Sequence, residues 1–105
     1  MDYNLIYITT VNLDEARRIG RILVEKRLAA CVNIIPIVQS VYWWKGKIYD
    51  EEETLMFVKT TKERVEEVIA EVKKLHSYEV PAIDVLDISG GNPEYLSWIS
   101  KEVAK

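Results

Sequence analysis

The sequence predicts a mixed α/β (α+β) fold, in which an antiparallel four-stranded sheet carries two main helices on one face. Three observations predict it: strand-like and helix-like segments alternate without a break, two helical segments start at capping motifs, and two long strand-like segments flank a short glycine turn. The 105 residues include 49% hydrophobic and 30% charged side chains, which is ordinary for one folded domain. We therefore expect residues 1–105 to form a single domain.

The first third of the chain predicts a strand, a helix and a second strand. Residues 3–10 are rich in Ile, Tyr and Thr, which favour a buried strand. Asn12 followed by Glu15 resembles a capping box, so a helix is expected to begin there. Residues 30–35 are again strand-like, until Pro36 removes a hydrogen-bond donor and predicts an edge position or a bulge.

The middle of the chain predicts a long β-hairpin. The strand resumes over residues 37–44, turns in the glycine-containing loop 45–47 and returns over residues 48–60. The acidic run 50–53 lies on the returning arm. We expect these charges to interrupt or twist the strand pairing and to discourage pairing with other chains.

The last third predicts a helix, a strand and a further helix. Thr60 followed by Glu63 resembles a second capping box, and the apolar residues after it keep strict helical spacing. Residues 81–89 predict a fourth strand, and Asn92 with Pro93 is typical of a helix start. The expected inner face of this last helix consists of Tyr95, Leu96, Ile99 and Val103. The order βαββαβ with an extra C-terminal helix is that of a ferredoxin-like sandwich with a long central hairpin.

Charge and composition exclude several classes of partner. The net charge of −3 and the pI near 5.2 provide no basic face for nucleic acid. No apolar run approaches the roughly 20 residues of a membrane span, and Asp2 stands where a secretory signal would carry Lys or Arg. The single cysteine, Cys31, cannot form an internal disulfide. We therefore expect a cytoplasmic protein with no nucleic-acid or membrane partner.

The predicted hairpin indicates a homo-oligomer. Each arm of about 13 residues reaches about 40 Å, whereas strands of about 8 residues and helices of about 15 residues cover roughly 20 to 27 Å. The projecting part carries an apolar load that a second copy of the chain would bury. The expected interface residues are Tyr42, Trp43, Trp44 and Tyr49. The alternative is that these aromatic side chains fold over the bare face of the chain's own sheet.

Five segments resemble the CutA family of divalent-cation tolerance proteins. They are residues 29–34 (AACVNI), 42–48 (YWWKGKI), 59–61 (KTT), 76–83 (HSYEVPAI) and 95–98 (YLSW). The resemblance extends over nearly the whole chain, and the combination is more specific than any one segment. It implies a ferredoxin-like fold, a homotrimer, a cytoplasmic location in prokaryotes and a role in tolerance of copper and other divalent metals. It also implies a likeness to the trimeric PII signalling proteins, which bind small effectors between subunits.

The chain departs from the family pattern at a proposed metal site. The usual His-Pro-Tyr of the family reads His76-Ser77-Tyr78, which lacks the rigidity of proline. A copper site proposed for bacterial relatives uses a cysteine in the first strand and two adjacent histidines. The matching positions hold Thr9, Leu75 and His76, so only one of the three ligands remains.

His76 is the only histidine and the main candidate metal ligand. Together with Glu79 it could offer an imidazole and a carboxylate to Cu(II) or another divalent cation. The alternative is that His76 only caps the C-terminus of the preceding helix. Cys31 is expected to be a buried, inert thiol, and the acidic run 50–53 a solvated face.

The same region could form a cleft between subunits. Trp44, Lys59, Tyr78 and Glu79 could line such a cleft and bind a small anionic or aromatic ligand, or they could form a buried interface network. We find no nucleophile with a base, no paired acid and base and no phosphate-binding loop, so neither an enzyme nor an organic cofactor is expected.

Two functions follow from these observations. The first is a non-enzymatic homotrimer that acts in divalent metal (copper) tolerance with weak cation binding. The second is a PII-like sensor that binds a small-molecule effector in the cleft between subunits.

Overall fold

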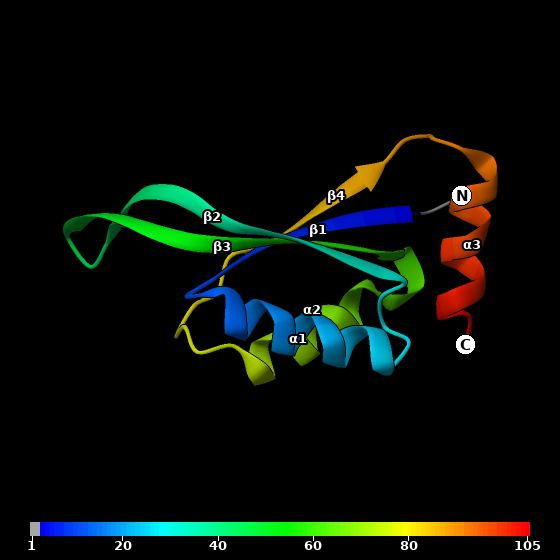
Figure 1. Ribbon diagram of the computed structural model, residues 1–105, viewed down its shortest axis with the longest axis horizontal. Helices are drawn as coiled ribbons and strands as arrows, with labels where there is room; N and C mark the ends of the chain where they lie inside the picture. Colours follow the sequence, from blue (N-terminus) through cyan, green and yellow to red (C-terminus); the bar gives the residue numbers. More distant parts are fainter. Residues whose placement is uncertain (1–2) are drawn as a thin grey trace.

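The computed structural model describes residues 3–105. These residues form four antiparallel strands and three helices (Figure 1). In chain order the elements are β1 (Tyr3–Thr10), α1 (Leu13–Glu25), β2 (Cys31–Trp44), β3 (Lys47–Thr61), α2 (Val65–Leu75), β4 (Ile83–Ile88) and α3 (Pro93–Val103). A 3-10 turn (Lys62–Arg64) directly precedes α2. The strand order in the sheet is β2-β3-β1-β4, with every neighbouring pair antiparallel. The predicted ferredoxin-like order is confirmed, and β4 is shorter than the predicted strand 81–89.

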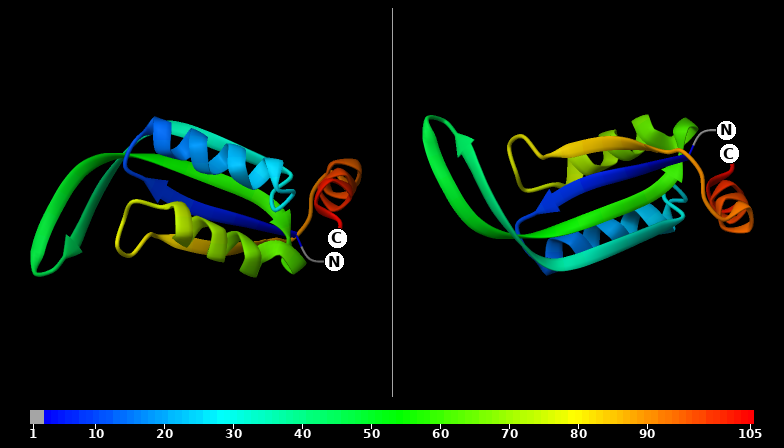
Figure 2. Two further views of the ribbon diagram at one scale, coloured as in Figure 1. Left: turned by 90° about the horizontal axis from the view of Figure 1, so that it is seen from below. Right: turned by 90° about the horizontal axis from the view of Figure 1, so that it is seen from above.

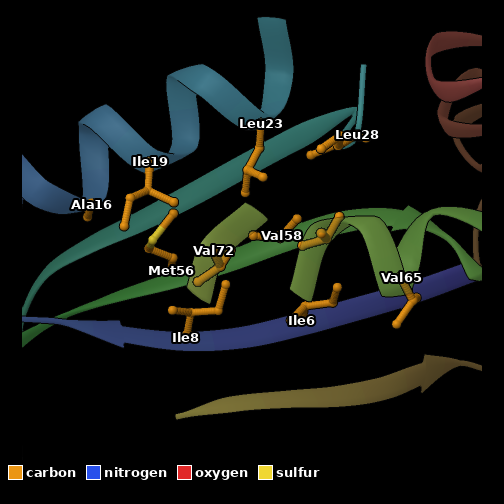
Figure 3. Close-up of a cluster of buried hydrophobic side chains, with 12 residues drawn as sticks. Ile6, Ile8, Ala16, Ile19, Leu23, Leu28, Met56, Val58, Val65 and Val72 are labelled. Carbon is orange, nitrogen blue, oxygen red and sulfur yellow. The ribbon is translucent and has the colours of Figure 1, made fainter. Parts of the chain in front are cut away.

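The two main helices lie on one face of the sheet, as predicted, and α3 lies at the end of the sheet opposite the hairpin tip (Figure 1). Alternate residues of β1 and β3 point towards α1 and α2 because side chains alternate between the faces of a strand. The resulting core, shown in Figure 3, contains Ile6, Ile8, Ala16, Ile19, Leu23, Leu28, Ala29, Met56, Val58, Val65, Val68 and Val72. The other face of the sheet is covered by neither α1 nor α2, and α3 contacts it only through residues such as Tyr3 and Lys59.

The capping box predicted at the start of α1 is confirmed. The side-chain oxygen of Asn12 accepts a hydrogen bond from the Glu15 amide at 2.9 Å. The Glu15 carboxylate reaches back and accepts from the Val11 amide at 3.1 Å. These bonds satisfy amides that a helix start leaves free. Glu15 as a residue is buried in the folded chain.

The second predicted capping box is wrong. Thr60 is still part of β3, and its buried hydroxyl donates to the Leu28 carbonyl at 2.7 Å. The chain then makes the 3-10 turn before α2, and no side-chain cap is found at either start. The capping signal at Thr60 was the same as at Asn12. The Thr60 hydroxyl is instead bonded to the Leu28 carbonyl, 32 residues away in the sequence.

The predicted irregularity at Pro36 is confirmed as a break in strand register between Ile35 and Val38. The Thr54 hydroxyl donates to the Pro36 carbonyl at 2.7 Å and so satisfies part of the interrupted pairing. Beyond this point β2 and β3 pair without interruption from Val38 with Glu53 to Trp44 with Lys47. The acidic run therefore does not interrupt the pairing, and the other expectation, that it twists the pairing, stays a prediction.

The hairpin projects because β1 pairs only with the Thr54 to Thr61 part of β3. Its tip is a two-residue turn with positive φ at Lys45 (50°) and Gly46 (79°), the combination of a type I′ turn. The molecule measures 44 × 24 × 22 Å as a result. Figure 2 shows the hairpin bending towards the side on which segment 76–82 lies.

The C-terminal helix α3 starts as predicted, because the Asn92 side chain accepts from the Glu94 amide at 3.1 Å. Ile99 and Val103 are buried, as expected for its inner face. Leu96 is half-buried, but Tyr95 is exposed, so its place on the predicted inner face is wrong. The exposed Tyr95 ring stacks on Trp98 instead, with ring centroids 5.5 Å apart.

Candidate functional site

A cavity of about 610 Å³ lies where the hairpin leaves the sheet. Three parts of the chain line it: the face of β1 that points away from α1 and α2, the two arms of the hairpin and the segment after α2. The lining residues are Tyr7, Thr9, Gln39, Ser40, Val41, Tyr42, Trp44, Glu53, Tyr78, Glu79, Val80 and Ala82. The bend of the hairpin (Figure 2) brings its arms and segment 76–82 to the same side of the molecule. A volume of this size can hold a small organic molecule.

Two tyrosine–carboxylate pairs define the polarity of this region. The Tyr78 hydroxyl donates to Glu53 Oε2 at 2.6 Å, and the Tyr42 hydroxyl donates to Glu51. Burial, and then the bond to Glu53, raise the pKa of Tyr78 well above its usual value. The bond to Glu51 is the main reason that the pKa of Tyr42 is raised to about 12. Both phenols therefore remain neutral hydrogen-bond donors near neutral pH.

Glu53 is a site residue that the sequence did not single out. It belongs to the acidic run for which a solvated face was expected, but its side chain is only 7% exposed. Tyr78 is the only hydrogen-bond donor to its carboxylate that is found among residues 3–105. The strand alternation could have placed Glu53 on the inner side of the hairpin, but its burial depends on Tyr78, which is distant in the sequence.

His76 ends α2, and the predicted capping position is confirmed. Its amide donates to the Val72 carbonyl at 2.9 Å. The buried ring does not turn to the helix end: Nδ1 accepts from the Tyr78 amide at 3.0 Å, and Nε2 donates to the Thr9 carbonyl at 2.7 Å. Because both ring nitrogens are occupied, the ring as folded does not fit a metal centre. The metal site of His76 and Glu79 stays a prediction, and a cation there would have to displace one of these bonds.

The other potential metal donors are scattered. Glu79 forms an exposed ion pair with Lys45 at 3.2 Å, at the rim of the cavity. Cys31 is half-exposed, not buried as expected, and its Sγ lies 3.7 Å from the Asn33 side-chain oxygen. Within residues 3–105 no three His, Cys, Asp or Glu side chains come together in a way that could hold a metal ion.

The cleft residues predicted from the sequence separate into two places. Trp44, Tyr78 and Glu79 meet at the cavity. Lys59 lies elsewhere, with its Nζ 5.3 Å from the Tyr95 ring centroid and 3.4 Å from the Tyr95 hydroxyl. A cleft that combines Lys59 with the other three residues was predicted between subunits, and it stays a prediction.

Comparison with known proteins gives the family. The profile of the family described as CutA1 divalent ion tolerance protein matches residues 4–102. This chain belongs to the CutA1 family.

Its CutA relatives come from archaea, bacteria and eukaryotes. The chain is 50% identical to the divalent-cation tolerance protein CutA of Archaeoglobus fulgidus over 101 residues, covering 96% of this chain and 98% of that protein. It is 45% identical to mouse protein CutA over 93 residues, but these make up 89% of this chain and 52% of the mouse protein. The chain thus spans about half of this mammalian relative.

The solved CutA structures share the fold. A structure of the Archaeoglobus fulgidus protein, described as a periplasmic divalent cation tolerance protein, superposes with a TM-score of 0.93 at 48% identity over 96% of this chain and 98% of that chain. CutA1 from Oryza sativa superposes with a TM-score of 0.96 at 35% identity, over 100% of this chain and 96% of the other. In the present chain, no helix within residues 3–105 is long and apolar enough to cross a membrane.

Ser77 has a structural role at the end of α2. The Ser77 amide donates to Glu15 Oε2 at 2.9 Å, a bond that proline could not make. Burial raises the pKa of Glu15, but the bonds from Ser77 and the Val11 amide outweigh it, so the pKa is lowered overall. Glu15 therefore connects the start of α1 to the end of α2.

Of the four residues predicted for an interface, the hairpin of this CutA chain exposes Tyr42 and Trp43 and leaves Trp44 and Tyr49 half-buried. Tyr42 and Tyr49 stack with centroids 5.5 Å apart, and Trp43 is 71% exposed. The alternative that Trp43 folds over the chain's own sheet is therefore wrong. Other large apolar side chains exposed on the two arms are Ile35, Ile37, Val41 and Ile48. Trimer contacts through these residues stay a prediction.

Proposed function

We propose that this CutA chain is a non-enzymatic homotrimer that acts in tolerance of copper and other divalent metals by binding cations weakly. The observation that carries the proposal is the family match over residues 4–102. The curated relatives it resembles are named for divalent-cation tolerance, and that name describes a response to metals without naming a reaction. The scattered carboxylates on an acidic chain suit loose binding of cations better than a preformed centre.

The homotrimer is supported by the exposed hairpin. A chain in water would leave Val41, Trp43 and Ile48 on one projecting element, and burial against other copies removes this apolar surface from water. Closed symmetry limits growth, because an open edge-to-edge contact would extend into filaments.

Titration calorimetry with Cu(II) tests the proposed metal binding. We expect weak binding to the wild type and about a tenfold loss of affinity in both His76→Ala and Glu79→Gln, since each removes one of only two proposed ligands. Glu25→Gln removes an exposed carboxylate far from His76 and serves as the control. Unchanged copper affinity in His76→Ala, with the helical circular dichroism signal intact, would exclude His76 as a ligand.

The cavity beside the hairpin supports a second candidate function. In a PII-like sensor, an effector would occupy a site near the hairpin and bias a contact with another protein. A volume of about 610 Å³ with aromatic walls is suited to such an effector. Saturable binding of a small molecule to the wild type, lost when the cavity is altered, is the result that this function requires.

We also propose a cytoplasmic location for the chain. The half-exposed free thiol of Cys31 suits a reducing compartment, where it is not oxidised. Cell fractionation with an antibody against the chain checks this location.

A further inference from the structure

The walls of the cavity combine aromatic rings with acidic groups. Four of the lining residues, Tyr7, Tyr42, Trp44 and Tyr78, are aromatic, and two, Glu53 and Glu79, are acidic. None of the lining residues is Lys, Arg or His. Aromatic faces carry negative potential and attract cations, and carboxylates do so more strongly. The lining therefore favours a positively charged ligand and disfavours an anionic one.

The buried carboxylate of Glu53 has no cationic partner. No ion pair of Glu53 is found among residues 3–105, and Tyr78 donates to only one of its two oxygens. Glu53 as a residue is only 7% exposed, but within residues 3–105 Asn4 Oδ1 is the only fully buried side-chain oxygen or nitrogen without a partner, so water in the cavity still reaches the second Glu53 oxygen. A cation that enters the cavity would supply this missing partner.

The chain itself shows which kind of cation the rim accepts. The ammonium group of Lys45 lies 5.5 Å from the centroid of the Trp44 ring and 3.2 Å from Glu79. The Lys45 ammonium group thus already contacts the Trp44 ring and the exposed Glu79 carboxylate. The deeper group, Glu53, is left for a ligand from outside.

A bare metal ion matches this lining less well. Hard divalent cations need several oxygen ligands close together, and no three potential ligands converge within residues 3–105. An organic ammonium ion needs only one carboxylate and can cover its alkyl groups with the aromatic walls.

We propose that the cavity between the hairpin, β1 and segment 76–82 binds a small organic ammonium ion, with its charge at Glu53 and its alkyl groups against Tyr7, Tyr42 and Trp44. The inference rests on the second proposed function, ligand binding at this cavity, and adds the class of ligand. It does not depend on copper binding by His76.

The test compares choline with its neutral isostere 3,3-dimethyl-1-butanol, which has the same shape without the charge. Calorimetry on the wild-type protein should detect choline binding that is at least about tenfold tighter than binding of the isostere, because only choline pairs with Glu53. Glu53→Gln should abolish this preference, since glutamine can still accept from Tyr78 but carries no charge. Glu52→Gln is the matched control: it makes the same change at the neighbouring position, on the opposite face of β3 and outside the cavity lining.

A second variant keeps the test decisive if Glu53→Gln does not fold. Lys45→Met removes the chain's own ammonium from Trp44 and Glu79, and it should raise the choline affinity severalfold. An unchanged or lower affinity in this variant would count against the inference.

The remaining outcomes separate the class of ligand from ligand binding itself. If the isostere or acetate binds as tightly as choline, the cavity is a ligand site but not a site for ammonium ions, and the inference is overturned while the sensor function stands. If none of the three probes binds saturably up to about 50 mM, a concentration at which even binding of about −2 kcal/mol is detectable, the inference is overturned.

Discussion

At the scale of single residues, the contact between Glu15 and Ser77 determines how the two main helices are held at the hairpin end of the sheet. Glu15 accepts from the Val11 and Ser77 amides, and its Oε1 lies 4.0 Å from Nδ1 of the buried His76 ring. The charge is buried, but two amide donors compensate it. Ser77 supplies one of these donors through its amide, a bond that a proline at this position could not make.

We predict that Glu15→Ala lowers the free energy of unfolding by about 2 kcal/mol at pH 7, because two amides lose a buried charged acceptor. The pKa of Glu15 is lowered in the folded protein, so its stabilisation is present above the pKa of the unfolded chain, about 4.3, and disappears as the pH falls through the lower folded value. Urea unfolding at pH 7 and pH 3 measures the difference, which should shrink at pH 3. Glu25→Ala, which removes only an exposed pair with Arg21, should cost less than about 0.5 kcal/mol. A difference between Glu15→Ala and wild type that is as large at pH 3 would contradict the role of the charge.

Single residues also show where prediction from sequence ends. Asn12 and Thr60 carry the same capping signal, but only Asn12 forms a cap. The Thr60 hydroxyl donates to the Leu28 carbonyl instead. Likewise Glu53 has the local sequence of a solvated charge, and only the fold places Tyr78 over it. Partners that are distant in the sequence decided both cases, and local spacing contains no information about them.

At the scale of elements, the hairpin was predictable because its signals are local. Glycine at the tip, proline at the register break and β-branched or aromatic residues in both arms act on the backbone directly. The β1 strand and the start of α3 follow from equally local signals. The bend of the hairpin was not predicted from the sequence, whereas Trp44, Tyr78 and Glu79, three of the four residues predicted for a cleft, do line the cavity.

We predict that Gly46→Ala loosens the hairpin tip without changing the sheet. A Cβ at Gly46 meets no atom within 4 Å, so the cost is that of placing alanine at φ 79°, about 1–2 kcal/mol. Amide hydrogen exchange in residues 41–50 should therefore accelerate by about five- to thirtyfold. Gly90→Ala is the control: a Cβ there also meets nothing within 4 Å, and its φ is not in the left-handed region. Equal exchange rates in both variants would show that the positive φ at the tip carries no strain for alanine.

At the scale of the whole molecule, the long axis of 44 Å exceeds the other two by about 20 Å, and the hairpin accounts for the difference (Figure 1). The projecting element carries exposed apolar side chains, and β4 at the sheet edge adds exposed Val85 and Leu86. Both surfaces are what an assembly of identical chains would cover. The hydrophobic pattern of the sequence predicted this exposed apolar surface on the hairpin, whereas the number of copies in the proposed assembly comes from the family resemblance alone.

The proposed homotrimer gives the last prediction. Light scattering at micromolar concentration should report three times the 12.2 kDa of one chain. Because folding and association are then linked, a hundredfold dilution should lower the stability by about 2 kcal/mol per chain and the melting temperature by several degrees. The double variant Trp43→Ser, Trp44→Ser should shift the mass towards one chain while the helical circular dichroism signal remains, because it removes apolar surface from the hairpin and none from the core of α1, α2 and the sheet. Val24→Ser, an equally apolar-to-polar change at an exposed position of α1, should leave the mass unchanged. A wild-type monomer with a concentration-independent melting temperature would mean that the chain tolerates its exposed hairpin in water.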